Sequence, residues 1–447
     1  MTLARQLARR AEDGRPVRVG LIGCGKFGSM YLTQARLTPG IHVLGIADVD
    51  PVRAKATLAR AGWPAEQTET GSFADALASG RTFLTEDVLQ LIAADGLDVL
   101  VDATGDPGAG IAHALAAIKN GRHIVMVNVE ADVLAGPLLA KQAADAGLVY
   151  SMAWGDQPAL IADHVDWART CGFKVVCAGK GTRYLPRYHQ LTPDTVWDTL
   201  REYLDLKDPS QINLKMFNSF LDGTKSGVEM SAVCNATGLT PQDDGLAFPP
   251  ASRFALSNVC KPSANGGTLT RSGTTEVVSS LTRDGKDVPH HLAMGTFVVI
   301  EAETDYAAQC FREYHMLEDD SGRFAALYRP THMIGMELGL SIASAVLRGE
   351  PTGAPVGFHS DVVATAKKAL KAGEILDGEG GFTVWGKQCP ANVSLEKGYL
   401  PLGLASHVPL TRDVAEGQIL TWDDVRIDPA DTAYKIRRQM EAMFGPH

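Results

Sequence analysis

Apolar and polar positions alternate regularly over the first third of the chain. Between residues 16 and 154, short apolar runs of strand length are separated by segments with the periodicity of amphipathic helices. This alternation predicts βαβ units and a doubly wound parallel sheet, which is a Rossmann domain of the α/β class. A short amphipathic helix over residues 1–15 is expected to lead into it. The predicted strands cover residues 17–23, 41–50, 97–105, 123–129 and 148–154.

The pattern changes after residue 154. Residues 155–354 mix helical periodicity with a hairpin-like stretch over 266–281 and a strand over 294–304, which predicts an α+β substrate or catalytic domain. A long helix over 331–349 is expected to close this domain and to return toward the Rossmann domain.

A third, smaller domain is predicted for residues 355–447, after a linker that contains two prolines. Its short segments with many turn residues indicate a β-rich fold. Residues 368–376 and 412–420 form a near-repeat, because both begin with a basic residue and end in Gly-x-Ile-Leu.

Composition argues against several classes of function. The net charge is -10 and there is no cluster of Lys and Arg, so no nucleic-acid partner is expected. No apolar run approaches ~18 residues, so no membrane partner is expected either. The N-terminus has no apolar core of a secretory signal. Seven cysteines without a C-x-x-C pair argue against a disulfide framework or a zinc site and favour a reducing cytoplasm.

A G-x-G-x-x-G motif follows the first predicted strand and opens a predicted helix. Gly23 would permit the tight turn, Gly25 would let the backbone approach a pyrophosphate, and Gly28 would let helix and strand pack closely. With the intervening Lys26 and Phe27, these glycines are the predicted phosphate end of a dinucleotide site. The alternative is a tight turn that binds no ligand.

Asp48 ends the second predicted strand, where a carboxylate should bind the ribose hydroxyls of the adenosine. Such a carboxylate repels a 2′-phosphate, which favours NAD over NADP. NADP stays possible because Arg53 could fold back onto a phosphate.

Two more blocks lie at predicted carboxyl ends of strands, where open α/β sheets bind ligands. Thr104, Gly105 and Asn128 are expected near the nicotinamide half of the cofactor. Glu130 could reach the substrate or could simply be an acidic residue in the first turn of a helix.

The blocks "VRVGLIGCGKFG", "VDATG", "HIVMVNVEADV", "AGKG" and "DGTKSGVEMSAVCNATGL" resemble oxidoreductases related to homoserine dehydrogenase that carry a C-terminal SAF domain, a β-clip module. The resemblance spans nearly the whole chain. One class of this group is similar in function to 1-deoxy-D-xylulose 5-phosphate reductoisomerase, which uses NADPH. Two positions depart from the pattern. Val129 follows Asn128 where homoserine dehydrogenases place a lysine, and Asp48 favours NAD.

The second domain contains the predicted catalytic residues. Lys180, between two glycines at a strand end, could polarise a carbonyl or move a proton, partly because of the resemblance. Its alternative is a surface turn lysine. In a helix, Asp222, Lys225 and Glu229 would share one face, either as catalytic and substrate-binding groups or as a solvent-exposed ion-pair stripe.

Three weaker substrate candidates complete the set: Asp156, Arg183 and Asn235. Arg183 could clamp a phosphate or carboxylate. The sequence has no metal-ligand motif. A divalent cation on Asp156, Asp222 or Glu229 would be reasonable only for a ketol rearrangement.

These features together predict an NAD(P)-dependent dehydrogenase or reductase for a small polar hydroxy or keto substrate, such as a polyol, a hydroxy acid or a sugar derivative. A reductoisomerase is the alternative within enzymes. A non-catalytic NAD-sensing protein is the alternative from another class. A homo-oligomer is expected.

Overall fold

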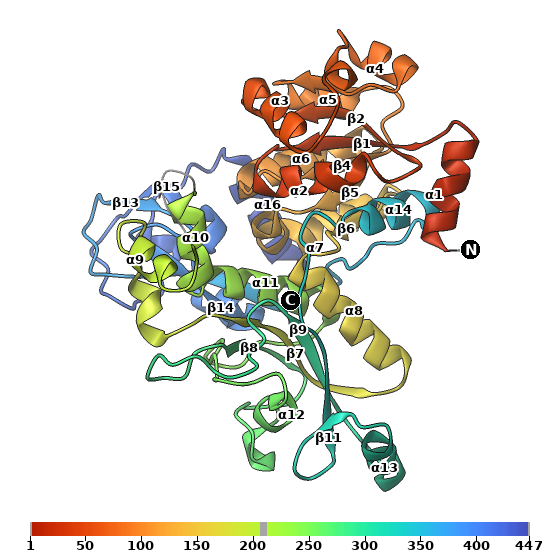
Figure 1. Ribbon diagram of the computed structural model, residues 1–447. Coiled ribbons are helices and arrows are strands. Elements are labelled where there is room, and N and C mark those ends of the chain that lie inside the picture. Colours follow the sequence, from red (N-terminus) through yellow and green to blue (C-terminus); the bar gives the residue numbers. More distant parts are fainter. Residues whose placement is uncertain (1, 206–211, 446–447) are drawn as a thin grey trace. The chain divides into compact units, whose positions relative to one another are not determined.

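The computed structural model describes residues 2–205 and 212–445. The chain forms two compact units. The first unit comprises Met1–Leu160 and Met333–Pro355, and the second comprises Ile161–His332 and Val356–His447. Among the described residues, each unit has its own sheets, one in the first unit and three in the second (Figure 1). The predicted division into three domains with boundaries near residues 154 and 354 stays a prediction.

The first unit is built on a six-stranded parallel sheet with the order β3-β2-β1-β4-β5-β6. This is the Rossmann order, and it confirms the predicted doubly wound α/β fold. The order reverses between β1 and β4, and the carboxyl ends of strands at such a switch point are where open α/β sheets bind ligands. The strands are β1 (Val17–Ile22), β2 (Ile41–Ala47), β3 (Phe83–Thr85), β4 (Val99–Asp102), β5 (His123–Met126) and β6 (Tyr150–Met152).

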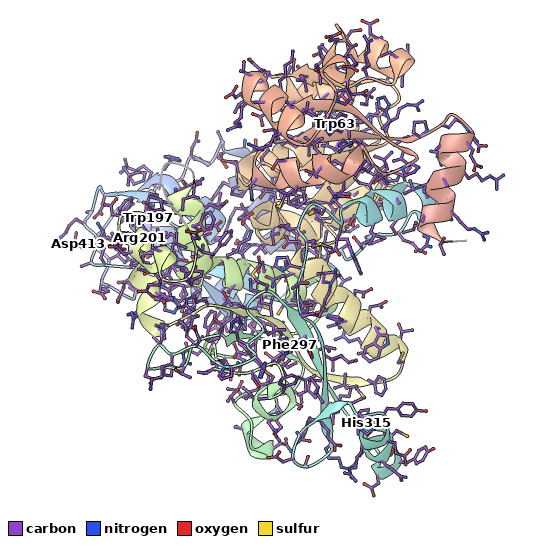
Figure 2. All side chains as sticks on the ribbon, in the orientation of Figure 1. Trp63, Trp197, Arg201, Phe297, His315 and Asp413 are labelled. Atoms are coloured by element: carbon purple, nitrogen blue, oxygen red, sulfur yellow. The ribbon has the colours of Figure 1, made fainter. Side chains whose placement is uncertain are left out.

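Helices cover the two faces of this sheet. The main ones are α1 (Leu3–Glu12), α2 (Lys26–Ala35), α3 (Pro51–Arg60), α6 (Pro107–Lys119), α7 (Val129–Asp145) and α14 (Gly339–Arg348). Trp63, labelled in Figure 2, belongs to the apolar core between helices and sheet. The sequence pattern missed three short elements between β2 and β4. They are α4 (Phe73–Ser79), the edge strand β3 and α5 (Val88–Ala93).

The helix predicted over 331–349 is shorter in the structure. Residues 334–338 form turns, and α14 begins only at Gly339. Gly335 has φ +78°, and a side chain there would press on the carbonyl of Phe27, 2.9 Å away. A left-handed residue in close contact with α2 cannot continue a regular helix, so the apolar pattern overestimated its length. The helix packs on α1 and β1, and Ile342 joins the Rossmann core.

The second unit contains a mixed five-stranded sheet with the order β10-β11-β9-β7-β8. The predicted hairpin over 266–281 is wrong, because only β8 forms there and it pairs parallel to β7. The strand expected over 294–304 is confirmed as β9, which carries Phe297 (Figure 2). The strands are β7 (Lys174–Thr182), β8 (Thr274–Ser279), β9 (Thr296–Glu301), β10 (Leu317–Glu318) and β11 (Phe324–Arg329).

Helix α11 (Thr224–Thr237) is almost entirely buried and packs on this sheet. It also contacts the C-terminal strands β12 and β14. Other helices before residue 332 are α8 (Gln157–Thr170, which begins in the first unit), α9 (Val196–Arg201), α10 (Leu214–Leu221), α12 (Leu256–Val259) and α13 (Asp305–Glu313).

The C-terminal segment is β-rich, as predicted. It contains β12 (Ser360–Ala366) paired antiparallel with β14 (Val384–Pro390), and β13 (Ile375–Asp377) paired antiparallel with β15 (Ser406–Pro409). Helix α15 (Ala391–Lys397) lies between β14 and β15, and α16 (Thr432–Phe444) follows the last strand. Helix α16 is fixed to β12 by the fully buried Arg437, which bonds both carboxylate oxygens of Asp361.

The near-repeat of this segment corresponds to reciprocal backbone pairing. Leu370 and Val414 occupy equivalent positions in the two copies, and each donates its N–H to the carbonyl of the other, at 2.8 and 3.0 Å. Two further backbone bonds of 2.9 Å are related in the same way: Gly373 to Leu410, and Gly417 to Ala366. The two copies therefore pair around a local pseudo-two-fold axis.

Candidate functional site

The turn between β1 and α2 is shaped by its three glycines. Gly23 has φ +90°, and a side chain there would press on the backbone of Ala103, next to β4. A Cβ on Gly28 would overlap the carbonyl oxygen of Gly23, so this glycine lets α2 lie directly on the turn. A Cβ on Gly25 would meet no described protein atom within 4 Å beyond its chain neighbours. The space beside Gly25 is where a Rossmann fold brings the cofactor's pyrophosphate close to the backbone.

The N-terminus of α2 has no side-chain cap, because its N-cap residue is Gly25. The first amides of a helix have no partner within the helix, and the helix dipole adds positive potential there. This end of α2 therefore fits a pyrophosphate group. Lys26 is exposed and Phe27 is half-buried beside it.

Asp48, just after β2, is buried and fixes the glycine turn. Its Oδ2 accepts the backbone N–H of Cys24 at 2.6 Å. Its Oδ1 accepts the N–H of Asp50 at 2.9 Å and pairs with the Arg53 guanidinium at 2.7 Å. The half-exposed Arg53 has its pKa raised by hydrogen bonding to this carboxylate. A cation therefore lies beside the carboxylate at the position where NAD and NADP differ.

A polar network centred on Asp102 connects the loop after β4 to the start of α7. Asp102 Oδ1 accepts the hydroxyl of Thr104 at 2.8 Å, and Oδ2 bonds the ring of His113 at 2.6 Å. Asn128 caps α7 by accepting the N–H of Ala131, and its amide donates to the Thr104 hydroxyl at 3.1 Å. The structure thus brings Thr104 and Asn128 together at two neighbouring strand ends.

The other two residues predicted in this region lie close by in the chain. Gly105 has φ +73° and faces open space. Glu130 is half-buried in the first turn of α7. Their assignment to the nicotinamide and the substrate stays a prediction.

A small cavity lies at the carboxyl ends of β5 and β6, within the first unit. It is small and narrow, and two of its lining residues are acidic. Asp156, at 4% exposure, accepts the N–H of Gln157 at 2.8 Å. The lining residues are Met126, Val129, Asp132, Met152, Ala153, Asp156, Pro158 and Ala159.

Asp132 is the more unusual of the two acids. It is 2% exposed, and its Oδ1 accepts the hydroxyl of Tyr150 at 2.9 Å. Its Oδ2 has no hydrogen-bond partner among the described residues. Burial raises the pKa of Asp132 from its ordinary 3.8 to about 7, and the Tyr150 hydroxyl opposes this only partly.

In the second unit, Lys180 and Glu229 form a buried ion pair. Lys180 comes from β7 and is 6% exposed, and Glu229 comes from α11 and is 5% exposed. Lys225 lies one turn earlier on α11 and is half-buried. The alternatives of a surface turn lysine for Lys180 and of a solvent-exposed stripe for Glu229 are therefore wrong. Buried charges of this kind need a partner or a function.

The spacing predicted that Asp222 shares one helix face with Lys225 and Glu229. This prediction is wrong, because Asp222 lies outside α11. It ends α10, and α11 begins only at Thr224, whose N–H it accepts at 2.9 Å. Its other oxygen pairs with Lys367 at 2.8 Å, and both side chains are fully buried.

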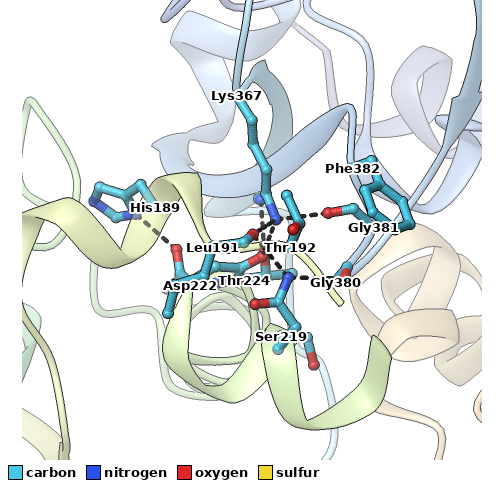
Figure 3. A network of polar contacts seen from close by, with 12 residues as sticks. His189, Leu191, Thr192, Ser219, Asp222, Thr224, Lys367, Gly380, Gly381 and Phe382 are labelled. Atoms are coloured by element: carbon cyan, nitrogen blue, oxygen red, sulfur yellow. Dashed lines mark hydrogen bonds and ion pairs between the residues drawn. The ribbon is translucent and has the colours of Figure 1, made fainter. Parts of the chain in front are cut away.

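Lys367 also donates to two backbone carbonyls, so it connects three segments (Figure 3). His189 Nδ1 donates to the Asp222 backbone carbonyl, 2.6 Å away. These bonds give Asp222 a clear structural role, and its catalytic role stays a prediction.

The two remaining substrate candidates are also held by protein contacts. Asn235 is fully buried and binds the backbone of Ser360 through both its amide nitrogen and its oxygen. Arg183 pairs with Asp287 at 2.8 Å and lies over the ring of Tyr203. Neither residue is brought next to the Lys180–Glu229 pair by a described contact.

A second cavity, lined by aromatic side chains, lies in the second unit. Trp385 stacks on His189 at 3.8 Å, and Phe248 stacks on Tyr184 at 3.9 Å. The Tyr184 hydroxyl bonds His189 at 2.7 Å, and burial lowers the pKa of that histidine. The lining residues are Gly223, Gly227, Asp244, Leu246, Phe248, Trp385, Gly386, Lys387 and Gln388.

Three buried charged residues near the candidate sites were not predicted from the sequence: Asp132, Asp102 and Lys367. Asp132 lies in the same sequence block as Asn128 and Glu130. Two acidic residues within one helical turn could have indicated it as a further candidate. Asp102 ends a predicted strand, so its position was also readable. Lys367 pairs with a residue 145 positions away in the sequence, and no local pattern indicates that.

Residues 155–338 match a family model described as "Oxidoreductase DRL, catalytic domain". The matched segment contains Lys180, Asp222, Lys225 and Glu229. This match confirms the expected oxidoreductase class at its coarsest level. The relation to homoserine dehydrogenase, the SAF module and reductoisomerase chemistry stay predictions. No curated protein matches the chain.

Solved structures with a similar architecture have low sequence identity. An oxidoreductase domain protein from Kribbella flavida is 13% identical over 76% of this chain and 92% of its own, with a TM-score of 0.41. A dipicolinate-bound dihydrodipicolinate reductase from Paenisporosarcina is 11% identical over 75% and 97%, with a TM-score of 0.35. A biliverdin reductase from Synechocystis, in complex with biliverdin and NADP+, is 20% identical over 38% of this chain, with a TM-score of 0.25. The chain spans about half of that reductase, 48%.

Residues 2–205 and 212–445 contain neither a metal-binding cluster nor a membrane-spanning helix. No group of three or more His, Cys, Asp or Glu side chains is arranged there to hold a metal ion. None of the helices in these ranges has the length and apolar character to cross a bilayer.

Proposed function

We propose that this protein is an NAD(P)-dependent oxidoreductase that transfers a hydride between the nicotinamide and a small polar hydroxy or keto substrate. The observation that carries the proposal is the uncapped end of α2 beside Gly25, at the switch point of a Rossmann sheet. The oxidoreductase match of residues 155–338 supports the same reaction class. Asp48 makes NAD the proposed cofactor, and the adjacent Arg53 keeps NADP open.

The cofactor would supply the hydride chemistry, and the protein would supply position and charge. Asp48 and the amides of the glycine turn would hold the adenosine ribose and the pyrophosphate. Lys180 is proposed to give or take the proton that accompanies the hydride at the substrate oxygen. Its ion pair with Glu229 would hold the side chain in position inside a buried site.

Calorimetric titration of NAD+ and NADP+ into the Gly25→Ala variant tests the proposal. The new methyl meets no atom of the described residues beyond its chain neighbours, so the melting temperature should fall only by the small cost of an alanine N-cap, while dinucleotide affinity should fall at least about tenfold by steric exclusion of the pyrophosphate. Gly71→Ala is the matched control, because Gly71 is exposed in the same unit and its added Cβ would be 3.7 Å from its nearest neighbour. Unchanged affinity in Gly25→Ala, or no binding of either dinucleotide to the wild type, contradicts the proposal.

Turnover needs its own test. A panel of polyols, hydroxy acids and hydroxyketones, followed by the absorbance of reduced nicotinamide, should give a substrate whose turnover Lys180→Met abolishes without loss of dinucleotide binding. Product analysis separates plain hydride transfer from the rearranged carbon skeleton of a reductoisomerase. If no substrate is turned over while NAD binds, the sensor alternative is favoured.

A further inference from the structure

The acidic cavity of the first unit contains a feature that the proposed reaction does not yet use. Asp132 Oδ2 is buried at its edge and has no partner among the described residues, while Oδ1 accepts the Tyr150 hydroxyl. A buried carboxylate oxygen without a hydrogen bond is costly, because it has lost its hydration without compensation. Such an atom in a cavity wall indicates that a donor from outside the protein completes it.

The surroundings of Asp132 are built to hold it in this position. The carboxyl lies along its own helix over Gly136, where an added Cβ would be 2.5 Å from Oδ1. Tyr150 on β6 fixes the other side at 2.9 Å. Asn128 caps the same helix turn, so the start of α7 is anchored as well. The Asp132 side chain therefore has a defined place among the residues that line the cavity.

The chemistry of the cavity wall selects the kind of group that fits. Asp132 and Asp156 are its ionisable groups, and none of its lining residues is Lys, Arg or His. Two carboxylates would repel a phosphate or a carboxylate group. An apolar group would leave Oδ2 without a partner. A neutral N–H donor satisfies the oxygen and meets the apolar wall formed by Met126 and Met152.

The position of the cavity points to the part of the cofactor that carries such a donor. Asp48 follows β2, on one side of the switch point, and the cavity lies at the ends of β5 and β6, on the other side. A dinucleotide bound across a Rossmann sheet places its adenosine near β2 and its nicotinamide toward the second half of the sheet. The nicotinamide carboxamide contains an NH2 group.

We propose that the Asp132 carboxyl, with Asp156 beside it, accepts a hydrogen bond from the carboxamide NH2 of the nicotinamide and so orients the ring. This inference rests on the proposed function. The ring orientation decides which face of the nicotinamide exchanges the hydride. Asp132 is thus a cofactor-binding residue that the glycine motif does not reveal.

The test compares a dinucleotide with its 3-acetylpyridine analogue, in which a methyl replaces the NH2. NAD+ or NADP+, whichever binds, and the matching analogue are titrated calorimetrically into the wild type and Asp132→Asn. In the variant, the Tyr150 hydroxyl should still donate to the amide oxygen, so a second donor faces the cavity. At pH 8, where Asp132 is ionised, the wild type should prefer the dinucleotide about tenfold, as expected for a hydrogen bond to a charged group. Asp132→Asn should reduce that preference to about twofold or less.

Two further variants make the result unambiguous. Asp132→Leu removes both side-chain oxygens and should also lose the preference for the dinucleotide over its analogue. This variant provides a second test if Asp132→Asn does not fold. Asp145→Asn makes the same chemical change on the exposed end of α7 and should keep it. Equal affinity of the wild type for both dinucleotides, or a preference retained in both Asp132 variants, overturns this inference and leaves the proposed function standing. Failure of the wild type to bind any dinucleotide overturns both.

Discussion

The buried carboxyl of Asp132 should make the stability of the first unit depend on pH. Asp132 ionises near 3.8 when unfolded and near 7 when folded, because burial disfavours its charged form. Between these pH values the folded state binds one proton more than the unfolded state, so stability falls as pH rises and levels off above about 7. Over an interval of about 3 pH units, at about 1.4 kcal/mol per unit, the loss approaches about 4 kcal/mol.

Asp132→Asn keeps the shape of the side chain and removes its charge. We therefore expect the free energy of unfolding of the variant, relative to the wild type, to increase by up to about 4 kcal/mol between pH 4 and pH 8. Urea unfolding at both pH values measures this difference in unfolding free energy. Hydrogen exchange of the β5 and β6 amides shows whether the difference arises in the first unit. Asp145→Asn should show no such trend, because Asp145 is mostly exposed. Parallel pH dependences of the wild type and Asp132→Asn would refute the reasoning.

Four other outcomes follow from the contacts described. Raising the pH from 6 to 8 should tighten binding of the oxidised dinucleotide more than binding of the reduced one, because at the proposed site the ionised Asp132 attracts the cationic nicotinamide ring. Calorimetry on the wild type and Asp132→Asn checks this difference. Arg53→Ala should weaken NADP+ binding at least tenfold and leave NAD+ within about twofold, and equal losses would exclude Arg53 as a 2′-phosphate ligand. Lys367→Met should cost about 3–5 kcal/mol in urea unfolding, since it leaves buried Asp222 unpaired, and adding Asp222→Asn should recover part of the loss. Gly373→Ala and Gly417→Ala should each cost about 1–2 kcal/mol, by the same amount, because both lie at positive φ in equivalent places with no crowding; unequal costs would contradict the pseudo-symmetry.

The Rossmann half of the fold was predictable because its strands are buried and its helices amphipathic. The role of Gly28 follows from the close packing of helix and strand that the glycine turn of a Rossmann sheet requires. The elements between β2 and β4 were missed because they have only three to seven residues, too few to show a period. The length of α14 was overestimated because its apolar pattern continues through Gly335, where a tertiary contact forces the left-handed conformation.

The candidate site was less predictable than the fold. The pairing of Lys180 with Glu229 joins a strand to a helix, and helical spacing alone could group Glu229 only with Lys225 and Asp222. Asp222 left that group because its helix ends there, and its partner Lys367 comes from the far C-terminal segment. The unsatisfied oxygen of Asp132 depends on the placement of Tyr150 and Gly136, which no sequence pattern records.

The reciprocal pairing of Leu370 and Val414 has a consequence for refolding. Each copy of the near-repeat supplies donors and acceptors that the other copy needs, so neither is complete alone. A neighbouring molecule presents the same complementary edge, and at high protein concentration it competes with the intramolecular partner. Concentrated refolding should therefore yield dimers intertwined through exchanged copies, and dilute refolding should yield single chains.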